Sequence, residues 1–221
     1  MPERSPGAAA EAAGRAGTRI AEAIFDFVGQ VPETDEPAHR DPAGRARRIG
    51  NATAARAALS AGGLALPPGP LGWLTILPEL RTVWKQQARM VADIAGAYGR
   101  TGDLSRETMI FCLFRHVAPG AFRSVVRHHG DRFSVRRVTP KVLHGIALKI
   151  GVRISLRVLG RGVTRWVPVV GALGVGAYAY YDTGRVAATA TELFAQPVDF
   201  SEPARDDGAA ARAAAGGTAG S

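Results

Sequence analysis

The chain has few of the residues that crosslink proteins or hold metal ions. It contains one cysteine, Cys112, so no disulfide can form within it. Cys112 lies in the apolar run 109–114, and we predict that it is a buried small hydrophobe. The five histidines are scattered and no H-E-x-x-H motif occurs, so we expect no metal and no cofactor. The fold must therefore depend on an ordinary hydrophobic core.

Long apolar runs are also missing. Residues 62–78 carry no charge but include three prolines, and the uncharged stretch 166–181 has only 16 residues. A membrane-spanning helix needs about 20 apolar residues, so we predict no span. An interfacial position or half of a re-entrant pair stays open for residues 166–181. Residues 1–17 lack the apolar segment of a signal peptide, and we expect the protein to stay on the cytoplasmic side.

Aromatic residues are sparse, at 7% of the chain, yet several bracket the stretch 166–181. They are Trp166, Tyr178, Tyr180 and Tyr181. Aromatic side chains in such places mark a membrane interface in some proteins and are ordinary core or rim residues in others. Both interpretations stay open from the sequence.

Acidic residues are scarce in the middle of the chain. Overall, 28 lysines and arginines face 19 acids, giving a net charge of +9, but residues 115–165 hold twelve of these cations and a single acid, Asp131. Repulsion among so many like charges indicates an anionic partner. The residues predicted to contact it are Arg123, Arg127, Arg136, Arg137, Lys141, Lys149, Arg153, Arg157, Arg161, Arg165 and Trp166.

Apolar residues recur at spacings of three and four, which is typical of helices. We predict an all-α fold, a single-domain bundle of six or seven helices over residues 16–200, with disordered tails at 1–15 and 203–221. Asp41-Pro42 and Thr139-Pro140 are helix-start signals, and Gly99 is a stop. The expected helices cover residues 18–29, 42–61, 71–98, 105–116, 120–129, 139–159 and 168–195.

Small residues recur along the last expected helix. Ala172, Gly176 and Gly184 are spaced by multiples of four, so we predict that a neighbouring helix, 42–61, packs closely there. Residues 174–179 also match the dinucleotide fingerprint G-x-G-x-x-A. That fingerprint needs a parallel sheet with further strands after the helix, and only tail-like residues follow. We therefore predict packing rather than nucleotide binding.

No catalytic constellation is evident. The chain has neither G-x-x-x-x-G-K nor G-x-S-x-G. The acids Glu79, Asp93 and Asp182 lie in apolar helices, where a helix-start charge or an ion pair with Arg89 or Arg185 accounts for them. We predict a non-catalytic protein.

Two segments resemble one bacterial family. Residues 68–71 lead through 74–80 into Ile94-Ala95-Gly96-Ala97-Tyr98-Gly99, and residues 167–171 lead into Gly174, Gly176 and Asp182. This pattern is similar to that of the EcsC protein family, over residues 45–195. The family takes its name from a gene beside an ABC transporter. The resemblance implies a helical, membrane-associated accessory protein and supplies no catalytic residues.

We therefore expect a peripheral protein of the cytoplasmic membrane face that docks onto anionic lipid or a membrane partner through its basic residues. Two alternatives use the same sequence. The charge also suits nucleic acid, and the glycine-rich last helix leaves room for a small ligand or an enzymatic pocket. A plain solvated surface is the fourth interpretation, although the sharp limits of the acid-poor stretch argue against it.

Overall fold

The structure is a computed structural model that describes residues 6–63, 72–129, 132–160 and 168–201. Within these ranges the side chains are described except at 6–13, 61–63, 72–80, 129, 157–160, 168–173, 175 and 201. The predicted tail 203–221 and the cations Arg161 and Arg165, with Trp166, lie outside the described residues.

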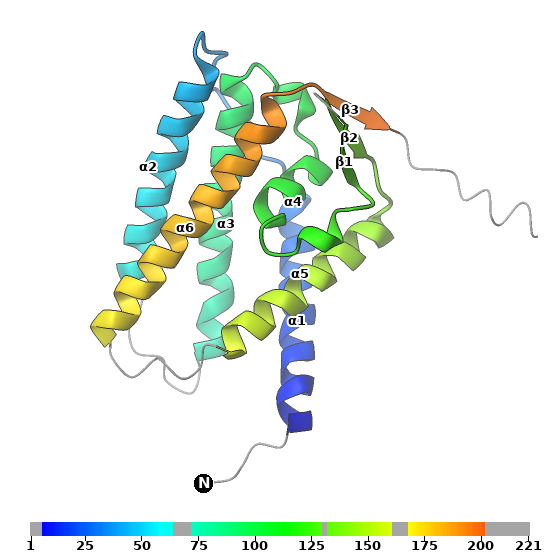
Figure 1. Ribbon diagram of the computed structural model, residues 1–221. Coiled ribbons are helices and arrows are strands. Elements are labelled where there is room, and N and C mark those ends of the chain that lie inside the picture. Colours follow the sequence, from blue (N-terminus) through cyan, green and yellow to red (C-terminus); the bar gives the residue numbers. More distant parts are fainter. Residues whose placement is uncertain (1–5, 64–71, 130–131, 161–167, 202–221) are drawn as a thin grey trace, which may run out of the picture.

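The described chain is mainly α-helical, which confirms the predicted fold class. Six α-helices form it, and a small sheet lies at one side (Figure 1). The helices are α1 (Pro6–Val28), α2 (Pro42–Gly63), α3 (Gly72–Ala97), α4 (Arg106–Phe114), α5 (Pro140–Gly160) and α6 (Pro168–Phe194). The remaining elements are the short 3-10 turns η1 (Thr101–Asp103) and η2 (Pro119–Ala121) and the strands β1 (Val126–His129), β2 (Arg132–Arg136) and β3 (Val198–Ser201).

The helix boundaries follow the local signals in the sequence. The Asp41 side chain accepts a hydrogen bond from the Gly44 N–H at 2.9 Å and so caps α2. Ser105 and Thr108 form a reciprocal capping box at the start of α4. Gly99, with φ of 66°, adopts the left-handed conformation that ends α3.

The helices pack as two long pairs around α3. Helix α1 lies along α5, α2 lies along α6, and α3 contacts α1, α2, α4 and α6 (Figure 1). Helix α4 is buried almost throughout, because it lies between these pairs. The largest fully buried side chains include Ile24, Met90, Ile94, Phe114, Ile150 and Leu193. Burial of this apolar surface is the main force that holds the helices together.

The prediction of a helix over residues 120–129 is wrong. Strand β1 pairs antiparallel with β2, and β2 pairs parallel with β3. Phe133 and Val135 are buried while their neighbours in β2 are not, which is the two-residue alternation of a half-buried strand. A helix would spread these side chains around its axis instead of placing them on one face.

Two further expectations differ from the structure. Helix α1 begins at Pro6, so residues 6–15 are helical rather than tail. Helices α2 and α6 do pack together as predicted, but Gly184 is exposed and a Cβ there would meet nothing within 4 Å. Gly176 is buried, and the close approach falls at Gly50, where a Cβ would lie 2.8 Å from the Cβ of Ala187. The side chain of Ala172 is outside the described set.

Candidate functional site

Most of the predicted cationic residues lie on elements that follow one another along the chain. Arg123 follows η2, Arg127 is on β1, Arg136 ends β2, and Arg137 follows it. Lys141, Lys149 and Arg153 are on α5, which the sheet adjoins at its N-terminal end (Figure 1). Six of these seven side chains are exposed and that of Arg136 is half-buried. The side chain of Arg157 is not among those described. We call the seven described residues the cationic surface.

The cationic surface is not neutralised by the described acids. None of its seven residues forms an ion pair with an acidic side chain in the described part of the chain. Two other cations of the same stretch do: Arg115 binds Glu192 at 2.7 Å, and Arg132 approaches Asp199 at 3.6 Å. Asp199, which pairs in register with Ser134, and Glu107, which accepts a hydrogen bond from the Val138 N–H, are acids beside these residues. The seven cations outnumber them, and an excess of like charge raises the local potential and attracts anions.

The sheet fixes the positions of some residues of the cationic surface. Side chains alternate between its faces, and Arg127 pairs in register with Ser134, which pairs with Asp199. Phe133 lies on the opposite, buried face, where its ring stacks on His128 with centroids 4.6 Å apart. Arg136 shares the face of Ser134, and the Arg137 guanidinium lies 5.6 Å from the centroid of the Phe200 ring. Sequence reasoning missed this arrangement because it assigned residues 120–129 to a helix and expected no strands in the chain.

Helix α5 has one packed face and one open face. Leu143, Ile146, Ala147 and Ile150 are buried in the core, on the side that packs along α1. Lys141, Lys149 and Arg153 lie on the other side and are exposed. Lys149 and Arg153 are spaced by four residues, which places them near one another on the solvent side of α5.

The tyrosines that the sequence left open are at the surface. Tyr178, Tyr180 and Tyr181 are 39%, 47% and 62% exposed on α6. Leu59 on α2 is 78% exposed, the largest value among the big apolar side chains described. These exposures argue against the interpretation of the tyrosines as core residues.

A second polar site lies inside the helices and was missed by sequence reasoning. Asp182 of α6 receives two contacts, from His116 Nε2 at 2.7 Å and from Gln87 Nε2 of α3 at 2.9 Å. Gln87 Nε2 also donates to the hydroxyl of Thr183 at 3.2 Å. The sequence pairs Asp182 with Arg185, three residues away, but the structure pairs it with His116 from a distant part of the chain. No sequence pattern near either residue predicts that contact.

His116 is almost wholly enclosed, with 9% of its side chain exposed. Its second ring nitrogen, Nδ1, is buried and finds no hydrogen-bond partner among the described residues. Unpartnered buried polar atoms are uncommon and call for a physical reason. The contact between Nε2 and Asp182 sets the orientation of the ring, and Nδ1 stays unpaired within the described residues. The cluster therefore joins α3, α6 and the turn that follows α4 as a structural tie.

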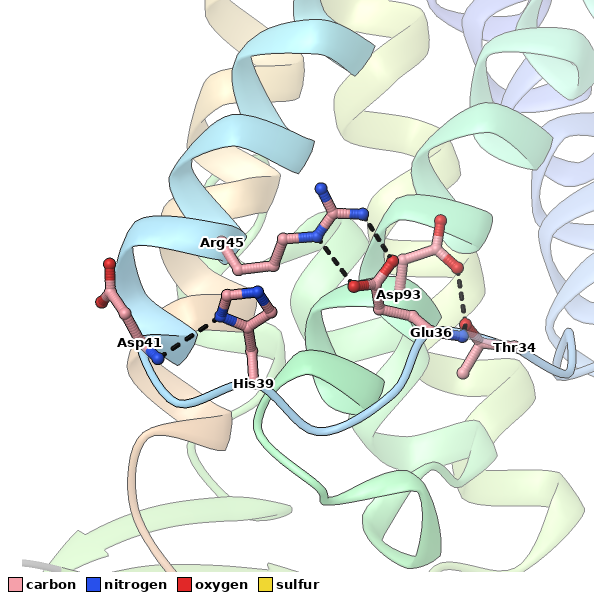
Figure 2. A network of polar contacts seen from close by, with 6 residues as sticks. All are labelled: Thr34, Glu36, His39, Asp41, Arg45 and Asp93. Atoms are coloured by element: carbon pink, nitrogen blue, oxygen red, sulfur yellow. Dashed lines mark hydrogen bonds and ion pairs between the residues drawn. The ribbon is translucent and has the colours of Figure 1, made fainter.

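A third set of polar contacts holds the segment between α1 and α2 against α3 (Figure 2). Arg45 donates two hydrogen bonds to the Glu36 carboxylate, at 2.7 and 2.8 Å, and these bonds lower the pKa of Glu36. The Thr34 hydroxyl donates to Asp93 at 2.6 Å, and Arg89 pairs with Asp93 at 3.4 Å as the sequence predicts.

The glycine of the Ile94-to-Gly99 motif has a place in this arrangement. A Cβ at Gly96 would collide with the backbone oxygen of Glu36. Only glycine lets the segment pass this close to α3, so the motif serves packing here. The His39 ring accepts a hydrogen bond from the backbone N–H of Asp41 at 3.4 Å, and the backbone N–H of His39 donates to the Ala97 carbonyl at 2.9 Å.

Other candidate groups are accounted for by burial. Cys112 is fully enclosed, and this burial raises the pKa of its thiol, which keeps it protonated and unreactive. Residues 174–179 lie within α6, not in the loop between a strand and a helix that a dinucleotide requires. Among the residues described, no group of three or more potential metal ligands occurs.

A helix that crosses a bilayer must be about 20 residues long and mostly apolar. No helix in the described ranges combines the length and apolar content needed to cross a membrane.

Comparison with family models, with curated proteins and with solved structures finds no match. The resemblance to the EcsC family stays a prediction. The function must then be inferred from the protein's own surface. Its cationic surface is the feature that packing within the fold explains least.

Proposed function

We propose that the protein is a non-catalytic accessory protein of the EcsC type that docks onto anionic lipid at the cytoplasmic face of a membrane. The observation that carries this proposal is the cationic surface: seven described cations on consecutive elements, none paired with a described acid. Folding gains nothing from gathering like charges, so a partner outside the chain is the simplest reason for them.

The expected strength of docking follows from the number of cations. Each Lys or Arg held near an anionic leaflet contributes about 1 kcal/mol, so five engaged residues contribute about 5 kcal/mol. Such binding weakens steeply with salt, because the interaction between exposed charges falls off within about 10 Å at 0.1 M.

Co-sedimentation with vesicles tests the proposal. We expect the full chain to bind vesicles that contain phosphatidylserine, to bind neutral phosphatidylcholine vesicles weakly, and to lose affinity as salt rises. The variant Lys141→Gln/Lys149→Gln/Arg153→Gln should bind anionic vesicles roughly 100-fold more weakly, since it loses three such contributions.

A matched variant controls for net charge. Arg47, Arg48 and Arg56 are exposed on α2, away from the cationic surface, and their replacement by Gln removes the same three charges. This control should bind nearly as the wild type does. Equal binding to neutral and anionic vesicles would contradict the proposal, as would tighter binding to duplex or single-stranded DNA than to the anionic vesicles at equal salt.

A further inference from the structure

The open face of α5 carries exposed apolar side chains as well as cations. Val142, Leu148 and Leu156 are 45%, 38% and 56% exposed, and Val152 is half-buried. Leu148, Val152 and Leu156 are spaced by four, so they form a ridge along one side of the helix. Lys149 and Arg153 each follow a ridge residue by one position, about 100° around the axis, and so run beside the ridge.

The fold does not bury the two leucines of this ridge. Helix α5 already buries a complete apolar face in the core, and α1 runs along that side. At the crossing, a Cβ on Gly151 would collide with the backbone oxygen of Gly17, so the two helices are in backbone contact. Val152 packs against α1 here too, because a Cβ on Gly17 would lie 3.0 Å from the Val152 Cγ2. Leu148 and Leu156 are the ridge residues that stay exposed.

Charge indicates what covers the ridge. The charged residues described on the open face of α5 are Lys141, Lys149 and Arg153, all of one sign. An apolar stripe bordered by cations alone matches a continuous anionic layer with hydrocarbon beneath it, whereas a protein groove would have to supply a matching row of acids.

We propose that α5 lies in the plane of the membrane, with Leu148 and Leu156 inserted below the headgroups and Lys149 and Arg153 at the phosphates. This inference rests on the proposed function and adds to it. The preferred surface is an anionic bilayer with loosely packed headgroups, such as one with unsaturated chains, because shallow insertion needs gaps between headgroups. Binding then keeps a component that salt does not remove.

Serine substitutions separate insertion from charge. We expect Leu148→Ser/Leu156→Ser to bind unsaturated phosphatidylserine vesicles roughly tenfold or more weakly than the wild type and to be released completely by a high-salt wash. The matched variant Leu59→Ser removes a leucine that is more exposed still, on α2, and should bind within about twofold of the wild type. Thermal unfolding curves show whether each variant is folded.

A fluorescent label gives a second measurement that does not depend on the serine variants. Cys112 is buried, so an introduced cysteine is the main labelling site in the native protein. An environment-sensitive dye on Leu156→Cys should shift to the blue on anionic vesicles and be quenched by spin-labelled lipid chains. The same dye on Leu59→Cys should show neither effect.

The outcomes separate this inference from the proposed function. If the protein binds anionic vesicles but the dye at position 156 stays in water and the serine variant binds normally, insertion is wrong and purely electrostatic docking stands. If the protein does not prefer anionic vesicles at all, the proposed function itself fails.

Discussion

Gly17 of α1 and Gly151 of α5 face each other where the two helices cross. A Cβ on Gly151 would overlap the backbone oxygen of Gly17, and a Cβ on Gly17 would lie 3.0 Å from the Cα of Val152. Two glycines here bring the backbones together, which lets α5 bury Ile146, Ala147 and Ile150 while presenting its cations outward. The orientation of the cations on α5 thus depends on a contact between two glycines, which have no side chain beyond a hydrogen atom.

We predict that Gly151→Ala destabilises the protein by about 1–3 kcal/mol, because the new methyl forces the two helices apart. Gly145→Ala on the same helix is the control. A Cβ there meets nothing within 4 Å, so this change should instead stabilise the protein by about 0.5–1 kcal/mol. Urea unfolding of both variants provides the measurement, and equal effects would show that the crossing is not tight.

Asp182→Ala is expected to cost about 1–3 kcal/mol in the free energy of unfolding, since it leaves the buried Gln87 amide and the His116 ring without their shared acceptor. Arg185→Ala removes the partner that sequence spacing suggests and should change stability by less than about 0.5 kcal/mol. Were the two substitutions to cost the same, the pairing of Asp182 with His116 would be in doubt.

The Glu36–Arg45 pair makes stability depend on pH. Hydrogen bonds from Arg45 lower the pKa of Glu36 below its ordinary value of 4.5, so the ionised carboxylate stabilises the fold above that value. This stabilisation is lost as the pH falls through the lowered pKa. We predict that Glu36→Gln is less stable than the wild type at pH 7 and that the difference shrinks in acid below about pH 4.

Glu33 lies in the same segment, is exposed, and serves as the comparison for that measurement. Glu33→Gln should track the wild type at every pH. Unfolding by urea at pH 7 and at acid pH, for all three proteins, gives the two differences directly. A Glu36→Gln curve parallel to the wild type over the whole range would contradict the assigned role of the pair.

Cys112 should resist thiol reagents in the folded protein. Its side chain is enclosed, and burial raises the pKa of the thiol, so both access and ionisation oppose the reaction. Labelling should become rapid only in denaturant, with a midpoint that matches the loss of helical circular dichroism. Fast labelling under native conditions would show that α4 is not packed as described.

Several helix boundaries are set by short-range signals in the sequence. Asp41-Pro42 caps α2, Ser105 caps α4, and Gly99 ends α3, all within a few residues of where the sequence predicts. Such signals work because they act on the backbone of their own turn. The predicted cations of α5 lie on the solvent side for a local reason too, because residues four apart fall on one side of a helix.

What sequence reasoning missed depends on contacts between distant residues. Strand β2 is completed by β3, whose Val198 pairs with Phe133, and no local pattern shows that these two segments meet. His116 and Asp182 are likewise 66 positions apart. Close packing of α2 against α6 was expected at Gly184, yet the close approach falls at Gly50 against Ala187, because the partner helix decides which small residue matters.

The pairing of α1 with α5 and of α2 with α6 also bears on how the chain folds during synthesis. Each early helix has its main partner near the other end of the chain. When α1 and α2 leave the ribosome, α5 and α6 have not yet been synthesised. The apolar faces of α1 and α2 therefore stay exposed until translation is nearly complete. Contacts between such distant parts of the chain favour late and slow folding, and they raise the risk that the nascent chain aggregates meanwhile.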